Sequence, residues 1–141
     1  SDYKKKIDEY IKVHDLHHQV VYDGITNRPL NALYEADIFA FPSAYEGFGL
    51  ALAEANSVGL PAVGFATAPA VNELIKDKIT GFLATDEDDF ARKLALLMDN
   101  KALRVKMGKE AREEMEKYSP DVVWGQWKEL LQKVVHKRID E

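Results

Sequence analysis

The sequence contains no cysteine, and only five prolines and eight glycines occur among its 141 residues. The lack of cysteine excludes disulfides, thiolate metal sites and cysteine nucleophiles, and it fits a reducing compartment such as the cytosol. The small share of proline and glycine excludes a fibrous or low-complexity chain. Hydrophobic residues make up 46% and charged residues 30% of the chain, so we expect one globular domain with its own hydrophobic core.

The chain also lacks long apolar runs and an excess of positive charge. No segment approaches the ~20 apolar residues that span a bilayer, and the first ten residues lack the apolar core of a signal peptide. Nineteen basic residues against 24 acidic residues give a net charge of -5. Beyond Lys4–Lys6 no basic stripe is present, so we expect no nucleic-acid partner. These observations predict a soluble, cytoplasmic protein.

Short apolar runs alternate with longer helical patterns, and Gly, Pro or Asn separate them. The predicted strands are Gln19–Tyr22, Asp37–Phe41, Pro61–Phe65 and Gly81–Ala84. The predicted helices cover Asp2–His14, Pro29–Ala36, Gly49–Val58, Ala70–Lys76, Glu87–Met98, Lys101–Lys117 and Pro120–Lys137. Asn27 and Asp86 are the predicted N-caps of the second and the fifth of these helices. This order predicts one α/β domain over residues 1–141, with a Rossmann-like, doubly wound parallel sheet flanked by helices.

The segment FPSAYEGFGLALAEA, residues 41–55, places Glu46 just after a predicted strand and Glu54 inside the next helix. Ligands of doubly wound sheets bind beyond the carboxyl ends of the strands. The free N–H groups and the dipole of a helix N-terminus attract a phosphate, and Gly47 and Gly49 let the backbone approach it closely. The two carboxylates, ~10 Å apart on helical geometry, are then able to hold the hydroxyl groups at the two ends of a sugar nucleotide.

A purely structural interpretation of the same two residues stays open on spacing alone. Glu46 as an acid at a helix N-terminus contributes ~0.3 to 1 kcal/mol, and Glu54 is then one more exposed helical glutamate. Arg28, beyond the first predicted strand, and Ser43, within the loop, are further candidates for the site.

The sequence predicts no metal site. We interpret the three histidines near residue 16 as a solvated helix end, and the acidic run at residues 86–89 as the charged start of a helix, since the calcium-loop spacing is missing. Trp124 and Trp127 on the last predicted helix are interpreted as packing residues.

The sequence around the two glutamates resembles the C-terminal, nucleotide-sugar-binding domain of retaining GT-B glycosyltransferases of the group 1 type. The resemblance runs through ADIFAFPSAYEGFGLALAEANSVGLPAVG, Ala36 to Gly64, which contains the E-x7-E signature, and through AVNELIKDKITGFLA, Ala70 to Ala84. It implies that Glu46 is the catalytic residue at the donor sugar and that Glu54 holds the ribose hydroxyls. The donor-binding residues that it implies are Glu46, Gly47, Phe48, Gly49, Leu50 and Glu54.

The resemblance implies transfer of a sugar from a nucleoside diphosphate sugar to an acceptor hydroxyl with retained configuration, in bacterial polysaccharide or glycolipid synthesis. No cofactor and no protein-bound metal are expected, because positioned hydrogen-bond donors stabilise the leaving diphosphate. Two other hypotheses remain: a non-catalytic nucleotide-binding regulatory module, and half of a nucleotide-sugar epimerase.

The sequence departs from the family pattern at its start, where a strand and a G-R-x4-K-G loop are missing. We therefore expect the first two strands, the basic diphosphate clasp and the acceptor-binding N-terminal domain to be absent, and this chain to be inactive alone. The partners expected for the full-length enzyme are that domain and an acceptor glycan or glycolipid, at the inner face of a membrane. In the family order 3-2-1-4-5-6 the missing strands lie between Gln19–Tyr22 and Asp37–Phe41, so we expect the unpaired edges to re-pair, associate or bind a partner.

Overall fold

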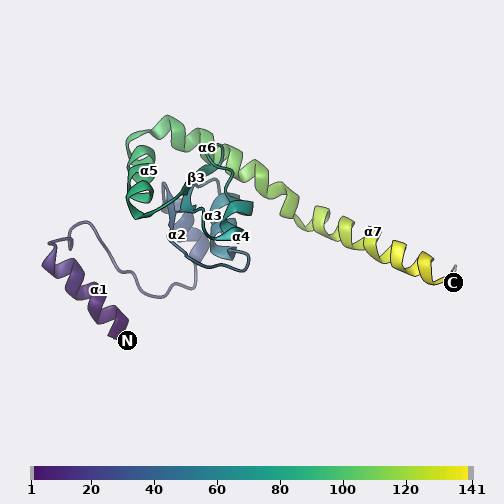
Figure 1. Ribbon diagram of the computed structural model, residues 1–141, viewed down its shortest axis with the longest axis horizontal. Coiled ribbons are helices and arrows are strands. Elements are labelled where there is room, and N and C mark those ends of the chain that lie inside the picture. Colours follow the sequence, from purple (N-terminus) through teal and green to yellow (C-terminus); the bar gives the residue numbers. More distant parts are fainter. Residues whose placement is uncertain (1, 140–141) are drawn as a thin grey trace.

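The computed structural model describes residues 2–139 and contains a parallel sheet between two layers of helices. The elements in chain order are α1 (Asp2–Val13), α2 (Pro29–Glu35), β1 (Phe39–Phe41), α3 (Leu50–Ser57), β2 (Ala62–Phe65), α4 (Pro69–Leu74), β3 (Gly81–Ala84), α5 (Glu87–Asp99), α6 (Lys101–Met115), the short 3-10 helix η1 (Glu116–Tyr118) and α7 (Pro120–Ile139). Figure 1 shows that α1 and α7 extend away from the central body in different directions.

The sheet has the strand order β1-β2-β3, and both pairs of neighbours are parallel. Phe41 at the end of β1 pairs with Gly64 of β2, which in turn pairs with Leu83 of β3. α3 and α4 form the two crossovers that parallel neighbours require. The predicted α/β class is therefore confirmed. Because the strands are parallel, their carboxyl ends lie together at the same end of the sheet.

Successive strand residues point to opposite faces of the sheet, and helices cover both faces. The core cluster under α3 and α4 contains Leu52, Ala62, Ala68, Val71, Leu74, Ile75 and Met115. The cluster under α5 and α6 contains Val63, Phe82, Leu97 and Met107. Ala62 and Val63 are neighbours in β2, belong to different clusters and are both fully buried. Burial on both faces explains why the sequence of β2 is apolar throughout, whereas β1 at the open edge is only partly buried and exposes Ala40.

α3 ends in a Schellman motif that lies against the backbone of α6. Gly59 has a positive φ of 86°, and the N–H groups of Leu60 and Gly59 donate to the carbonyls of Ala55 and Asn56, each at 3.0 Å. A Cβ atom on Gly108 of α6 would overlap the carbonyl oxygen of Gly59. The close approach of α6 to the end of α3 therefore requires a glycine at position 108.

The predicted strand over Gln19–Tyr22 is wrong, because this segment lies outside the sheet. Val21 and Tyr22 are 77% and 61% exposed, and the segment connects α1 to α2 across open space in Figure 1. A strand forms where a neighbouring strand takes its N–H and C=O groups, and no strand of the described residues lies beside this segment. The N-cap of α2 is also Arg28 instead of the predicted Asn27.

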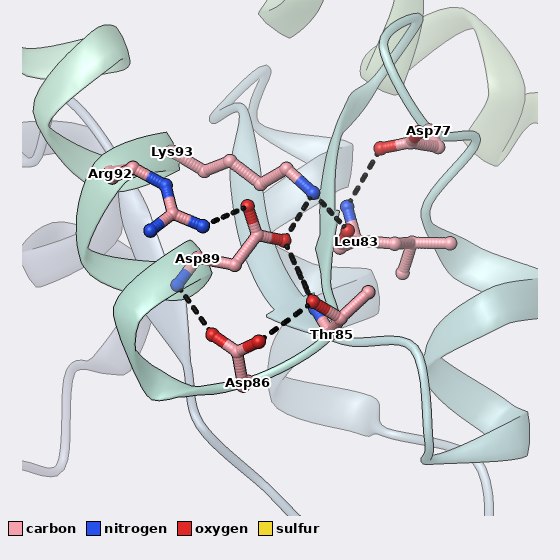
Figure 2. A network of polar contacts seen from close by, with 7 residues as sticks. All are labelled: Asp77, Leu83, Thr85, Asp86, Asp89, Arg92 and Lys93. Atoms are coloured by element: carbon pink, nitrogen blue, oxygen red, sulfur yellow. Dashed lines mark hydrogen bonds and ion pairs between the residues drawn. The ribbon is translucent and has the colours of Figure 1, made fainter.

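The two edges of the sheet differ in how they are protected. On β3, the Leu83 N–H donates to Asp77 Oδ1 at 2.9 Å, and the Leu83 carbonyl accepts from Lys93 Nζ at 2.6 Å (Figure 2). These side chains block further strand pairing at β3. β1 pairs only with β2 within residues 2–139, so its other edge is open. This open edge lies where an unpaired edge was expected, and association through it stays a prediction.

Asp89 organises the start of α5, as Figure 2 shows. Its carboxylate accepts from Lys93 Nζ at 2.7 Å and from the Thr85 N–H at 3.1 Å. The Asp89 N–H donates to Asp86 Oδ1 at 2.8 Å, so Asp86 is the N-cap that the sequence predicts. The Lys93 ammonium, followed by the Thr85 N–H, lowers the pKa of Asp89 from 3.8 to about 2.

We expect Asp89→Asn to destabilise the protein near neutral pH and to have little effect at about pH 2. The pKa of Asp89 is lowered in the folded state, so its contribution is complete above the unfolded value of 3.8 and is lost as the pH falls toward 2. Urea unfolding of the variant and the original protein at pH 6 and pH 2 measures the difference, with Asp88→Asn in the same turn as a control. A difference that stays equal at both pH values would contradict this assignment.

α7 projects away from the sheet (Figure 1). It carries exposed apolar side chains. Trp124 and Trp127 are 71% and 53% exposed, so the prediction that they pack is wrong for the described part of the chain. The helix contacts the rest of the chain chiefly through η1, which leaves most of its apolar face uncovered. Among residues 2–139, no helix has the length and apolar character needed to cross a membrane.

Candidate functional site

The loop between β1 and α3 surrounds a cavity of about 370 Å³ at the carboxyl end of the sheet. The lining consists of Phe41, Glu46, Phe48, Gly49, Leu50 and Ala51. The volume lies within the roughly 300–1,000 Å³ of small-molecule sites. Ligands of open α/β sheets bind beyond the carboxyl ends of the strands, so this cavity is the site that the fold favours.

α3 begins beside the cavity without a capping side chain. Its N-cap residue, Gly49, has φ 84° and ψ 52°, a left-handed conformation that glycine adopts without strain. The first turn contains no acidic residue, and the N–H groups of Leu50, Ala51 and Leu52 have no acceptor within the helix. The start of α3 therefore offers free donors and the positive end of a helix dipole, an arrangement that suits a phosphate.

Glu46 is half-buried in the wall of the cavity. The Ser43 hydroxyl lies 3.1 Å from Glu46 Oε1 and 3.0 Å from the Tyr45 carbonyl oxygen, and its single proton serves one acceptor at a time. Glu46 Oε2 has no hydrogen-bond donor among the described residues. Ser43 thus orients the carboxylate and leaves one oxygen able to accept hydrogen bonds from a ligand hydroxyl.

Phe48 is held in place by an aromatic contact from the end of α6. Its ring packs edge-on against Tyr118 of η1, with the ring centroids 5.5 Å apart and an interplanar angle of 85°. Lys117 Nζ lies 5.0 Å from the Tyr118 ring centroid. Tyr118 could not be predicted from the sequence, because no local spacing connects η1 with the loop and only tertiary packing brings them together.

The structure gathers part of the predicted site into one cavity. Four of the predicted residues line it: Glu46, Phe48, Gly49 and Leu50. Gly47 is exposed in the loop between them, and a Cβ atom there would meet no heavy atom within 4 Å. Ser43 joins the group through its contact with Glu46.

Glu54 and Arg28 belong neither to the lining of this cavity nor to the loop around it. Glu54 is exposed on α3, and within the described residues its carboxylate makes no hydrogen bond or ion pair. Arg28 is exposed at the N-cap of α2, where its backbone N–H donates to Thr26 Oγ1 at 3.0 Å. The roles of Glu54 and Arg28 toward a ligand therefore stay predictions.

The cavity contains a carboxylate but no basic side chain in its lining. Lys93, which lies near the carboxyl end of β3, already binds Asp89 and the Leu83 carbonyl. Among the side chains that the structure describes, in residues 2–135, no group of three or more His, Asp or Glu is placed to hold a metal ion. Positive potential at the cavity therefore comes from the backbone N–H groups of α3.

Residues 1–114 match the model of the family described as Glycosyl transferases group 1. The poly(ribitol-phosphate) alpha-N-acetylglucosaminyltransferase of Staphylococcus aureus (strain COL) is 32% identical over 131 residues, which cover 91% of this chain and 27% of that protein. This chain thus spans about a quarter of the length of that curated relative.

Solved structures give the same result. S. aureus TarM in complex with fondaparinux, alpha-GlcNAc-glycerol and UDP aligns with a TM-score of 0.80 and 32% identity, over 90% of this chain and 26% of that chain. The C-terminal domain of LpcC, a glycosyl transferase group 1 family protein from Francisella tularensis, aligns with a TM-score of 0.74 and 27% identity, over 84% of this chain and 64% of that chain. The chain belongs to the glycosyl transferases group 1 family and has the fold of a GT-B C-terminal domain.

Proposed function

We propose that this chain is the donor-binding part of a retaining glycosyltransferase, which transfers a sugar from a nucleoside diphosphate sugar to an acceptor hydroxyl. The observation that carries the proposal is the uncapped start of α3 beside the Glu46 carboxylate in one cavity. The N–H groups suit the diphosphate, and the carboxylate suits the sugar hydroxyls. Family membership supports a transferase over a regulatory module or an epimerase half, and the related TarM was solved with UDP bound.

The chemistry follows from where charge develops. The bond between the anomeric carbon and the diphosphate oxygen breaks, and the acceptor oxygen forms a new bond to that carbon on the same face. The acceptor proton passes to an oxygen of the leaving phosphate. The first N–H groups of α3 stabilise the negative charge on the diphosphate. Glu46 holds the sugar hydroxyls through Oε2, while Ser43 orients its other oxygen.

The cavity needs positive charge that the described part of the chain does not bring to it. The lining contains no lysine or arginine, whereas a diphosphate is bound most strongly by charge-assisted donors. We propose that the basic residues and an acceptor-binding domain belong to parts of the complete enzyme outside this chain, which covers only 26% of the TarM chain. The S. aureus relative named for poly(ribitol-phosphate) supports a polysaccharide or glycolipid as the acceptor.

In the complete enzyme, we expect Glu54→Ala to raise the Kd for the nucleoside diphosphate. The exposed, unpaired carboxylate is free to accept two ribose hydroxyls, and losing such charged hydrogen bonds, at about 1.5–3 kcal/mol, weakens binding roughly 10- to 100-fold. Calorimetric titration with UDP, GDP and ADP gives the Kd. The Kd of Glu54→Gln should lie between those of Glu54→Ala and the original enzyme. Ser57→Ala, one turn later on the same exposed side of α3, should have the Kd of the original enzyme. Equal affinities for Glu54→Ala and the original enzyme would remove Glu54 from the site.

Turnover tests the reaction itself. The complete enzyme is incubated with a panel of nucleoside diphosphate sugars and glycan or glycolipid acceptors, and NMR of the anomeric proton reports the new bond. We expect the product to keep the anomeric configuration of the donor. An inverted product would refute the retaining mechanism, and an epimerised nucleotide sugar formed without an acceptor would refute the transferase proposal.

A further inference from the structure

Asn56 is a fully buried polar residue near the C-terminal end of α3, the helix that begins at the cavity. Its Nδ2 atom donates to the Leu74 carbonyl at 2.9 Å. Leu74 is the last residue of α4, so its carbonyl is among those that a helix leaves without an internal donor. Asn56 therefore satisfies the end of α4 from the neighbouring helix.

Leu74 also contacts the start of α3 through its side chain. The side chain is 2% exposed, and its Cδ1 atom would lie 3.3 Å from a Cβ atom on Gly49. It therefore packs directly on the backbone of the left-handed N-cap that precedes the free N–H groups. One residue, Leu74, is thus fixed at its carbonyl by Asn56 and supports Gly49 with its side chain.

The amide of Asn56 is costly at this position. Its Oδ1 atom is buried and has no hydrogen-bond partner among the described residues, which is unfavourable in an apolar core. A leucine of similar size would bury no unpaired oxygen, but it would leave the Leu74 carbonyl without a donor. The one hydrogen bond that Asn56 makes is therefore the physical role of its polar group.

We propose that Asn56 is a positioning residue for the donor site. Through Leu74 it fixes the backbone at Gly49, and thereby the direction of the N–H groups that face the diphosphate. The inference rests on the proposed function, and it extends the site to a residue that touches no part of the donor. Small displacements matter here, because a shift of about 1 Å in positioning groups can cost roughly 100-fold in rate.

The test compares Asn56→Leu with Val63→Ala in the complete enzyme. Val63 is fully buried on the opposite face of the sheet, so its truncation lowers stability without touching Leu74. At a temperature where urea unfolding shows every variant folded, we expect Asn56→Leu to raise the Kd for the nucleoside diphosphate and lower kcat/KM, each about tenfold. Val63→Ala should change neither. Asn56→Ala serves as a second variant with the same expected direction.

The route through Leu74 is tested by a double-mutant cycle. If Asn56 acts through Leu74, Asn56→Leu in a Leu74→Ala background should add little further loss in Kd. Additive losses, an unchanged Kd in both Asn56 variants, or an equal loss in Val63→Ala would overturn the proposal.

A ligand-free measurement separates this inference from the proposed function. The NMR amide signals of Gly49, Leu50 and Ala51 should shift in Asn56→Leu and stay in place in Val63→Ala, whether or not a nucleotide binds. Unmoved signals overturn the positioning role. An original enzyme that binds no nucleoside diphosphate overturns the proposed function instead.

Discussion

Replacing Glu46 by alanine in the complete enzyme should lower kcat about 100-fold and leave the Kd for the nucleoside diphosphate nearly unchanged. Glu46 Oε2 meets no hydrogen-bond donor from the residues that the structure describes, and Oε1 is held by Ser43 at 3.1 Å, so the carboxylate is oriented for the donor sugar. The sugar must be held in line for transfer, whereas the nucleotide is bound elsewhere in the site. Steady-state transfer kinetics and calorimetric titration with the nucleoside diphosphate measure the two effects separately.

Two further variants serve as comparisons for the kcat of Glu46→Ala. Ser43→Ala removes the orienting hydroxyl but keeps the carboxylate, so it should reduce kcat by less than Glu46→Ala. Glu113→Ala removes an exposed carboxylate of α6, whose ion pair with Lys109 at 3.7 Å is weak, and should leave kcat unchanged. If Glu46→Ala kept full turnover, or if it weakened nucleotide binding as much as Glu54→Ala, the role given to Glu46 would be wrong.

Gly108→Ala should lower the free energy of unfolding by about 2–3 kcal/mol, the upper part of the roughly 1–3 kcal/mol found when atoms are forced into a packed interior. The added Cβ atom in the middle of α6 would overlap the carbonyl oxygen of Gly59, a backbone atom that has no rotamer to change. α6 must then move away from the end of α3. Because α3 also begins at the cavity, we expect weaker nucleotide binding in this variant as well.

Gly125→Ala is the matched control for this substitution. Gly125 also lies within a helix, but a Cβ atom there would meet nothing within 4 Å. Alanine should therefore stabilise α7 by up to about 1 kcal/mol, its advantage in helix propensity. Urea unfolding of both variants gives the comparison, and a Gly108→Ala protein as stable as Gly125→Ala would contradict the close contact between α6 and Gly59.

Local signals in the sequence were sufficient to predict the sheet and the loop at its edge. The apolar run before Pro42 forms β1, although its Ala40 is exposed and its two phenylalanines are only partly buried. Gly59 ends α3 through a positive φ, and Asp86 caps α5. Each depends on neighbours a few residues away. The same is true of the Glu46 loop, because a strand end followed by glycine and a helix start is a local pattern.

Features that depend on distant parts of the chain could not be predicted in the same way. Gln19–Tyr22 has a strand-like sequence but finds no neighbour in the described residues, and strand formation requires one. Tyr118 behind Phe48 and the pair of Asn56 and Leu74 behind Gly49 are joined by packing across many intervening residues. No spacing rule connects such residues, so only the folded structure identifies what supports the site.

A crystal structure of the complete enzyme with a bound nucleoside diphosphate would test the site assignment most directly. We expect diphosphate oxygens to accept hydrogen bonds from the N–H groups that begin α3, with the ribose hydroxyls at the Glu54 carboxylate. A second hollow, of about 170 Å³, lies at the amino ends of β1 and β2 and is lined in part by Lys101 and Arg104. A diphosphate bound there, with the start of α3 unoccupied, would contradict the donor site at the Glu46 loop.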